Sequence, residues 1–147
     1  MVDKSAIGVM FSPVHAQVEA GRLRYFFETL GERNPVYRDP AAAKAAGYDG
    51  VPIPPTYLFC LEMMDSENPF EFLQTLNIDL GRVLHGEQRF DYHAPVVVGD
   101  ALTFESHVAD VVDKKGGSLT FVTIETKITN QHGSHVADAT RSVVVRN

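Results

Sequence analysis

Four polar side chains within one short stretch could carry out acid–base chemistry: Glu32, Asn34, Tyr37 and Asp39. A carboxylate close to a phenol on an irregular loop can exchange protons with a bound substrate. The same residues also suit turn formation, because Asn34 precedes Pro35 and Asp39 can cap a helix. The residues alone leave both interpretations open.

A helix is expected on each side of this loop. Apolar residues recur at i, i+3, i+4 and i+7 from Leu23, which predicts a helix from Gly21 to Leu30 that ends at Gly31. Asp39-Pro40 suits the cap and first position of a second helix, with strong helix formers from Ala41 to Ala46. These helices would fix both ends of the loop.

The most apolar segment follows a proline-rich turn. Thr56 to Met64 is apolar nearly all round, which predicts a buried helix, and Phe70 to Leu76 predicts another short one. Cys60 has no evident neighbouring base and is expected to be a core thiol. Met63 and Met64 are expected to lie in the core or to line an acyl tunnel.

From Val83 onward the apolar period changes to two, which is typical of strands. Together with an early strand, this predicts an antiparallel sheet of about five strands, with one buried helix against it, in the α+β class. The exposed edges of such a sheet favour a dimer partner. The expected strands run from Phe11 to Val18, from Val83 through Tyr92, from Leu102 to Val108, from Leu119 to Thr129 and from His135 to Val145.

Length and composition predict one domain over residues 1–147 and an ordinary globular protein. The net charge of -6 and the lack of a Lys/Arg cluster argue against nucleic acid or an anionic membrane as a partner. The single cysteine, Cys60, excludes an intrachain disulfide. We expect a cytoplasmic location, because we see neither a signal peptide nor an apolar run of about 20 residues.

The histidines are interpreted separately. His85 stands beside Gly86 and is either an active-site or interface histidine or a structural one, whereas His93 is expected to be structural. His132 and His135 flank a turn and are expected to be exposed rather than metal-binding, since we find no carboxylate or cysteine that completes a ligand set.

The loop resembles a known motif. Gly31 to Asp39, followed by Ala43 and Gly47-Tyr48, is similar to the hydratase motif of the MaoC-like, (R)-specific enoyl-thioester hydratases. In those proteins the pattern Gly-Asp-x-Asn-Pro-[Leu/Ile/Val]-His-x-Asp precedes Ala and Gly-Phe.

Three further segments resemble the N-terminal, FAS1-like dehydratase branch of that family, which is related to the dehydratase region of fungal-type fatty acid synthase. They are Pro54 to Tyr57, Val83 to Gln88 and Tyr92 to Asp100. Taken together, the resemblance extends from about Phe11 to Val145.

The resemblance implies a hot-dog fold, in which a five-stranded sheet wraps around a long helix and packs against a second hot dog. It implies a substrate that is a 3-hydroxyacyl or 2-enoyl thioester of coenzyme A or acyl carrier protein, bound in a tunnel between the two halves. Asn34, Pro55, Thr56 and Gly86 are the substrate-binding positions that it implies. No metal or other cofactor is expected.

The chain departs from the motif at the two catalytic positions. Glu32 stands where the catalytic Asp is expected, and Tyr37 stands where the catalytic His is expected. A phenol titrates near ~10 and an imidazole near ~6.5, so Tyr37 exchanges protons less readily at neutral pH.

Three interpretations follow from this departure. The favoured one is the non-catalytic half of a dehydratase, whose hot-dog partner has an intact Asp and His. In the second, a homodimer is active through Glu32 and Tyr37, with His85 as a further candidate. In the third, a homodimer only binds acyl thioesters or acts like a thioesterase.

Overall fold

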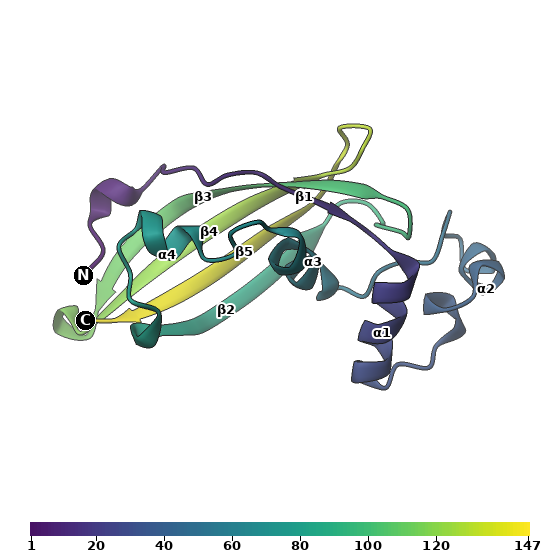
Figure 1. Cartoon of the computed structure of the whole chain (residues 1–147), viewed down its shortest axis with the longest axis horizontal. Helices are drawn as coiled ribbons and strands as arrows, with labels where there is room; N and C mark the ends of the chain where they lie inside the picture. The colour runs from purple at the N-terminus through teal and green to yellow at the C-terminus, as the bar shows by residue number, and fades with distance from the viewer.

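The computed structural model of the protein describes all 147 residues. Five strands form one sheet, and four short α-helices lie in the first half of the chain (Figure 1). In chain order the elements are β1 (Val14–Gln17), α1 (Ala20–Leu30), α2 (Pro40–Ala45), α3 (Tyr57–Asp65), α4 (Glu71–Thr75), β2 (Val83–Tyr92), β3 (Ala101–Lys114), β4 (Leu119–Thr129) and β5 (His135–Arg146). Single 3-10 turns occur at Lys4–Ala6, Pro35–Tyr37, Leu80–Arg82 and Lys115–Gly117.

The sheet is antiparallel throughout, in the order β1-β3-β4-β5-β2, so β1 and β2 are its edges. The expected five-stranded α+β architecture is confirmed. β1 is shorter than the predicted strand from Phe11 to Val18, because Pro13 has no N–H to donate to a ladder. β3 is longer than predicted and continues to Lys114, which pairs with Leu119 across the hairpin.

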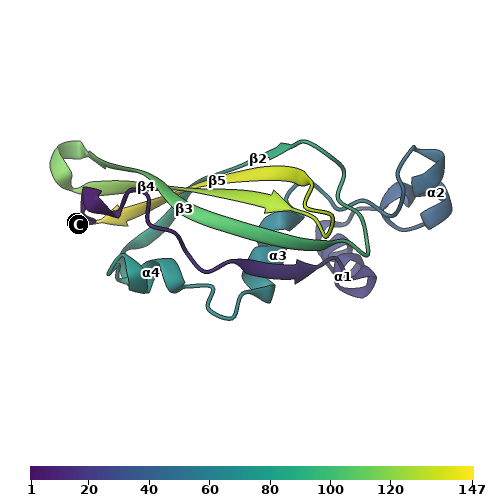
Figure 2. The same cartoon turned by 90° about the horizontal axis from the view of Figure 1, so that it is seen from above.

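The helix α3 lies against one face of the sheet, and α4 lies on the same side (Figure 2). Tyr57, Leu58 and Leu61 of α3 are fully buried in the larger of two apolar clusters. The predicted buried helix is therefore present, although the helix expected to be long has nine residues. Met64 is 51% exposed at its end, so it does not lie in the core, which was one of its two predicted places.

A polar layer crosses the interior between the two apolar clusters. On β3, Ser106 stands between residues of different clusters, and its hydroxyl lies 2.8 Å from that of Thr126 on β4. It also donates to Glu62 of α3 at 3.4 Å, and Arg141 of β5 lies 3.6 Å from the same carboxylate. The layer thus joins the central helix to three strands by polar contacts.

Cys60 lies on the half-buried side of α3 and packs against the larger cluster, as expected for a core thiol. Burial raises the pKa of its thiol above the ordinary value. No helix has the length and hydropathy needed to cross a membrane. The helix α1, the loop after it and α2 project beyond one end of the sheet (Figure 1).

Candidate active site

The loop after α1 is built from turn and cap residues, as the sequence predicted. Gly31 ends α1 with a φ of 67°, a left-handed conformation that glycine adopts without strain. The side chain of Asn34 accepts a hydrogen bond from the Val36 N–H at 3.1 Å and caps the 3-10 turn Pro35–Tyr37. Asp39 caps α2 by accepting from the Ala41 N–H at 2.9 Å.

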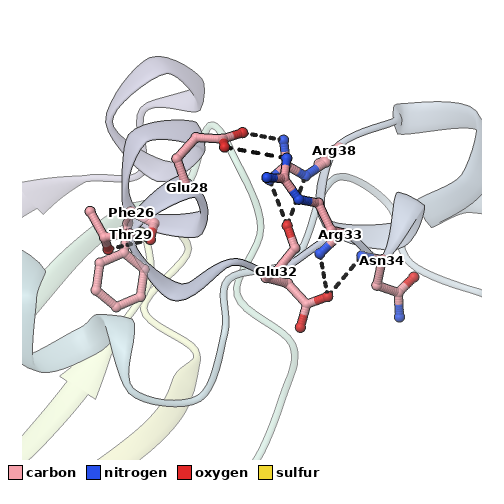
Figure 3. Close-up of polar contacts among 7 residues, drawn as sticks. All are labelled: Phe26, Glu28, Thr29, Glu32, Arg33, Asn34 and Arg38. Carbon is pink, nitrogen blue, oxygen red and sulfur yellow. Dashed lines mark hydrogen bonds and ion pairs between the residues drawn. The ribbon is translucent and has the colours of Figure 1, made fainter.

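The carboxylate of Glu32 is bound to its own loop. Its Oε1 accepts hydrogen bonds from the backbone N–H groups of Arg33 and Asn34, at 2.8 Å and 2.7 Å (Figure 3). The side chain therefore satisfies two amides that no helix or strand uses. One oxygen of this candidate catalytic carboxylate has a structural role.

The guanidinium of Arg38 connects the loop to α1 through hydrogen bonds. Arg38 donates from Nε and Nη2 to the carbonyl oxygen of Glu32, and its Nη1 lies 2.6 Å from Oε1 of Glu28 (Figure 3). Because of Arg38, the pKa of Glu28 is below its ordinary value. Arg33 reaches the same carboxylate at 3.4 Å from a more exposed position.

Tyr37 faces a pocket. Its ring centroid lies 5.0 Å from that of Phe27 in α1. The pocket has a volume of about 370 Å³ and opens widely to the surface. Its walls are formed by Tyr37, Tyr48, Pro52, Ile53, Pro55 and the segment Tyr92–Val96.

Pro55 and Thr56 lie where the chain enters α3. The carbonyl oxygen of Pro55 accepts a hydrogen bond from the Tyr92 hydroxyl at 2.9 Å, which ties this turn to the end of β2. Burial raises the pKa of Tyr92 well above its usual range, so the hydroxyl stays a donor. Thr56 is exposed at the start of α3, and its hydroxyl makes no capping bond.

His85 and Gly86 lie on β2 and do not line the pocket of Tyr37. The imidazole of His85 stacks on Phe59 with ring centroids 5.5 Å apart. Gly86 is the extra residue of a bulge between His85 and Glu87. A Cβ at Gly86 would lie 2.8 Å from Cγ2 of Val144, so close packing against β5 requires glycine here.

Of the predicted site residues, the structure brings Tyr37 and Pro55 together at one pocket. Sequence reasoning missed Tyr48 and Tyr92, which line the same pocket, and assigned His93 only a structural role. Tyr92 and His93 adjoin Ala94-Pro95, and this turn signal was the one available clue to a pocket wall.

The predicted exposure of His132 and His135 is confirmed, but the predicted lack of a neighbouring carboxylate was wrong for His135. A carboxylate does join His135: Oδ1 of Asp138 lies 2.8 Å from its Nε2, and Oδ2 lies 2.6 Å from Nε2 of His93. His132 points elsewhere, with its Nε2 3.3 Å from Nε2 of Gln131. The hydrogen bonds from the two histidines outweigh the effect of burial and hold the pKa of Asp138 below its ordinary value.

The comparisons with known proteins identify the family. A family described as "FAS1-like, dehydratase domain region" matches residues 5–139. The chain belongs to this family. Among similar proteins, a UPF0336 protein of Saccharopolyspora erythraea is 38% identical to this chain over 146 residues, which cover 99% of this chain and 92% of that protein.

Solved structures agree on the fold of this FAS1-like chain. The chain is similar to the HadBC (3R-hydroxyacyl-ACP dehydratase) complex of Mycobacterium tuberculosis, with a TM-score of 0.80, 24% identity and coverage of 95% of this chain and 96% of that one. It is also similar to the (R)-hydratase from A. caviae, with a TM-score of 0.69, 23% identity and coverage of 93% and 94%. The predicted hot-dog fold is thus confirmed.

Proposed function

We propose that this chain is the non-catalytic half of an (R)-specific 3-hydroxyacyl-thioester dehydratase, also able to act as a 2-enoyl-CoA hydratase. Its partner is a second MaoC-like hot-dog subunit that supplies the catalytic Asp and His. The substrate is an acyl thioester of coenzyme A or acyl carrier protein, and the reaction needs no further cofactor. Membership of the FAS1-like dehydratase region and the likeness to the HadBC dehydratase complex support this proposal.

The main support for the proposal is the chemistry of the motif loop, by which we mean Gly31 to Asp39. Dehydration removes a proton from C2 and the hydroxyl from C3, so one group must accept a proton and another must donate one. In this chain, Glu32 Oε1 accepts from two backbone amides, and a phenol occupies the position of the imidazole. A phenol with a pKa near ~10 is a poor proton carrier at neutral pH.

The free edge at β2 supports a partner subunit. This strand has ten residues and pairs only with β5, so its outer row of N–H and C=O groups has no strand beside it in the chain. Leu84 on the same strand is 50% exposed. Unprotected edges and exposed apolar side chains are features of interfaces.

The experiment measures crotonyl-CoA hydration by the purified chain alone and by the chain co-purified with a MaoC-like subunit that has an intact Asp and His. We expect no turnover by the chain alone and turnover by the pair. In the pair, Glu32→Gln should retain activity, whereas Asp→Asn in the partner's motif should abolish it. Turnover by the chain alone that is lost in Glu32→Ala or Tyr37→Phe would contradict the proposal.

The same preparation tests the alternative function, an acyl-thioester-binding or thioesterase-like homodimer without hydratase activity. Hydrolysis of the thioester releases the coenzyme A thiol, which a thiol reagent detects, whereas hydration leaves the thioester intact. Release of the thiol by the chain alone would favour the alternative. The pocket of Tyr37, which has six hydrophobic lining residues of ten, is the site for acyl contact in either case.

A further inference from the structure

Three metal-ligating side chains meet where β2 ends and β5 begins. Nε2 of His93, Nε2 of His135 and the carboxylate of Asp138 all lie within 4.8 Å of one another. The two imidazole nitrogens approach different oxygens of Asp138, at 2.6 Å and 2.8 Å. We call these three residues the His–His–Asp cluster.

A bulge in β5 creates the cluster. Thr129 pairs with His135 and Ile128 pairs with Ala137, so Val136 is an extra residue in β5. In a regular strand, residues three apart point to opposite faces. The extra residue places the buried pair Val136 and Ala137 inward and lets His135 and Asp138 share the outer face.

The backbone holds the third member against the same bulge. The N–H groups of His93 and Ala94 donate to the carbonyl oxygen of Val136, at 2.8 Å and 3.2 Å. The cluster therefore lies at the ends of two paired strands rather than on a long flexible loop. Such placement lowers the cost of organising ligands around an ion.

Charged side chains of both signs flank the cluster. Asp91 stands directly opposite Asp138 in the β2–β5 ladder, and like charges in this arrangement repel. Arg89 compensates Asp91 at 2.9 Å, and Lys127 of β4 is opposite Asp138 on its other side.

The ligand types indicate which cation fits. Two imidazoles and one carboxylate suit Zn²⁺ and similar transition metals, whereas Mg²⁺ and Ca²⁺ prefer oxygen ligands alone. A tetrahedral Zn²⁺ with bonds of about 2.0–2.2 Å separates its ligand atoms by about 3.3 Å. The two nitrogen–oxygen separations, 2.6 Å and 2.8 Å, are shorter than this value, and all three ligand atoms lie within 4.8 Å of one another.

We propose that His93, His135 and Asp138 bind a divalent transition-metal ion of the Zn²⁺ class, with one coordination position open to solvent. On binding, each Nε2 loses its proton and exchanges its hydrogen bond to Asp138 for a bond to the ion. A neutral imidazole transfers this proton to Nδ1 through solvent, and an imidazolium releases it to solvent and keeps the proton already on Nδ1. Because His93 also lines the pocket of Tyr37, the bound ion lies behind one wall of that pocket.

The test is calorimetric titration of the untagged, metal-free chain with ZnCl₂, with MgCl₂ as the comparison ion. We expect one Zn²⁺ per chain, no response to Mg²⁺, and a Zn²⁺ affinity reduced at least about tenfold in His93→Ala, His135→Ala and Asp138→Asn. The matched control is His132→Ala, an exposed histidine of the same turn that lies outside the cluster and should leave the affinity unchanged.

A second measurement guards against variants that do not fold. Excess Zn²⁺ should raise the thermal unfolding midpoint of the unaltered chain and of His132→Ala, and leave the midpoints of the three cluster variants unmoved. Absence of stoichiometric Zn²⁺ binding by the unaltered chain would overturn the proposal. Equal loss of affinity in His132→Ala, or full affinity in Asp138→Asn, would overturn it as well. None of these outcomes depends on hydratase activity.

Discussion

The motif loop and the His–His–Asp cluster lie near one pocket but are built in opposite ways. In the loop, the side chains of Glu32, Asn34 and Asp39 each bond to backbone N–H groups one or two residues away. In the cluster, two side chains from β5 and one from the residue that follows β2 bond only to one another. Polar residues that stabilise their own turn are poorly placed for chemistry, whereas groups that converge from separate strands stay available to a ligand.

The first prediction concerns the loop and has the largest expected effect. Arg38→Met removes two donors to the Glu32 carbonyl and one contact to Glu28, so the free energy of unfolding should fall by about 2 kcal/mol. Urea unfolding measures the change. The control is Arg33→Met, whose side chain is 74% exposed, and its change should stay within about 0.5 kcal/mol. Equal effects of the two variants would mean that the hydrogen bonds of Arg38 do not stabilise the loop.

Glu32 itself gives the second prediction. Glu32→Ala leaves two backbone amides without their acceptor and should lower the free energy of unfolding by about 1 kcal/mol. Glu32→Gln keeps an acceptor oxygen and should cost less. Amide hydrogen exchange at Arg33 and Asn34 should accelerate in the alanine variant more than in the glutamine variant. If Glu32→Ala changed neither the free energy of unfolding nor the amide hydrogen exchange, the carboxylate would not stabilise the loop.

The third prediction tests the cluster in the absence of metal. Asp138→Asn should change the free energy of unfolding by less than about 0.5 kcal/mol, because the side chain is 40% exposed and its loss of charge relieves the repulsion from Asp91. Chemical unfolding in the presence of a chelator measures this value. A loss above about 1.5 kcal/mol would make the cluster a stabilising element like the loop, and the contrast between the two regions would disappear.

The smallest effect is a pH dependence in the loop. The pKa of Glu28 is lowered in the folded state by Arg38, so its contribution to stability is present above the unfolded value, near ~4.3, and is lost as the pH falls through the folded value. Urea midpoints of the unaltered chain and of Glu28→Gln should therefore differ at pH 6 and converge towards pH 3. A difference in urea midpoint that stays constant from pH 6 to pH 3 would argue against the ion pair between Glu28 and Arg38.

Much of the fold was predictable from the sequence because its signals are local. Helix α1 and its end at Gly31, the turn at Asn34, the cap at Asp39, and the buried character of Tyr57 to Leu61 follow from spacing, capping and turn chemistry. The β4 strand was predicted with its observed bounds, since β-branched residues fill it between two turn signals. The exposure of Met64 was not predictable, because it depends on where α3 ends relative to the sheet.

The motif loop follows from the sequence alone, since every bond that shapes it joins residues close in the chain. The sequence alone also shows that Glu32 and Tyr37 replace the Asp and His of the motif, because this depends only on residue type. The meeting of His93, His135 and Asp138, in contrast, is a product of the tertiary fold. Their meeting depends on one extra residue, Val136, in the pairing of β4 with β5, and a register shift of this kind arises from strand pairing rather than from any local pattern.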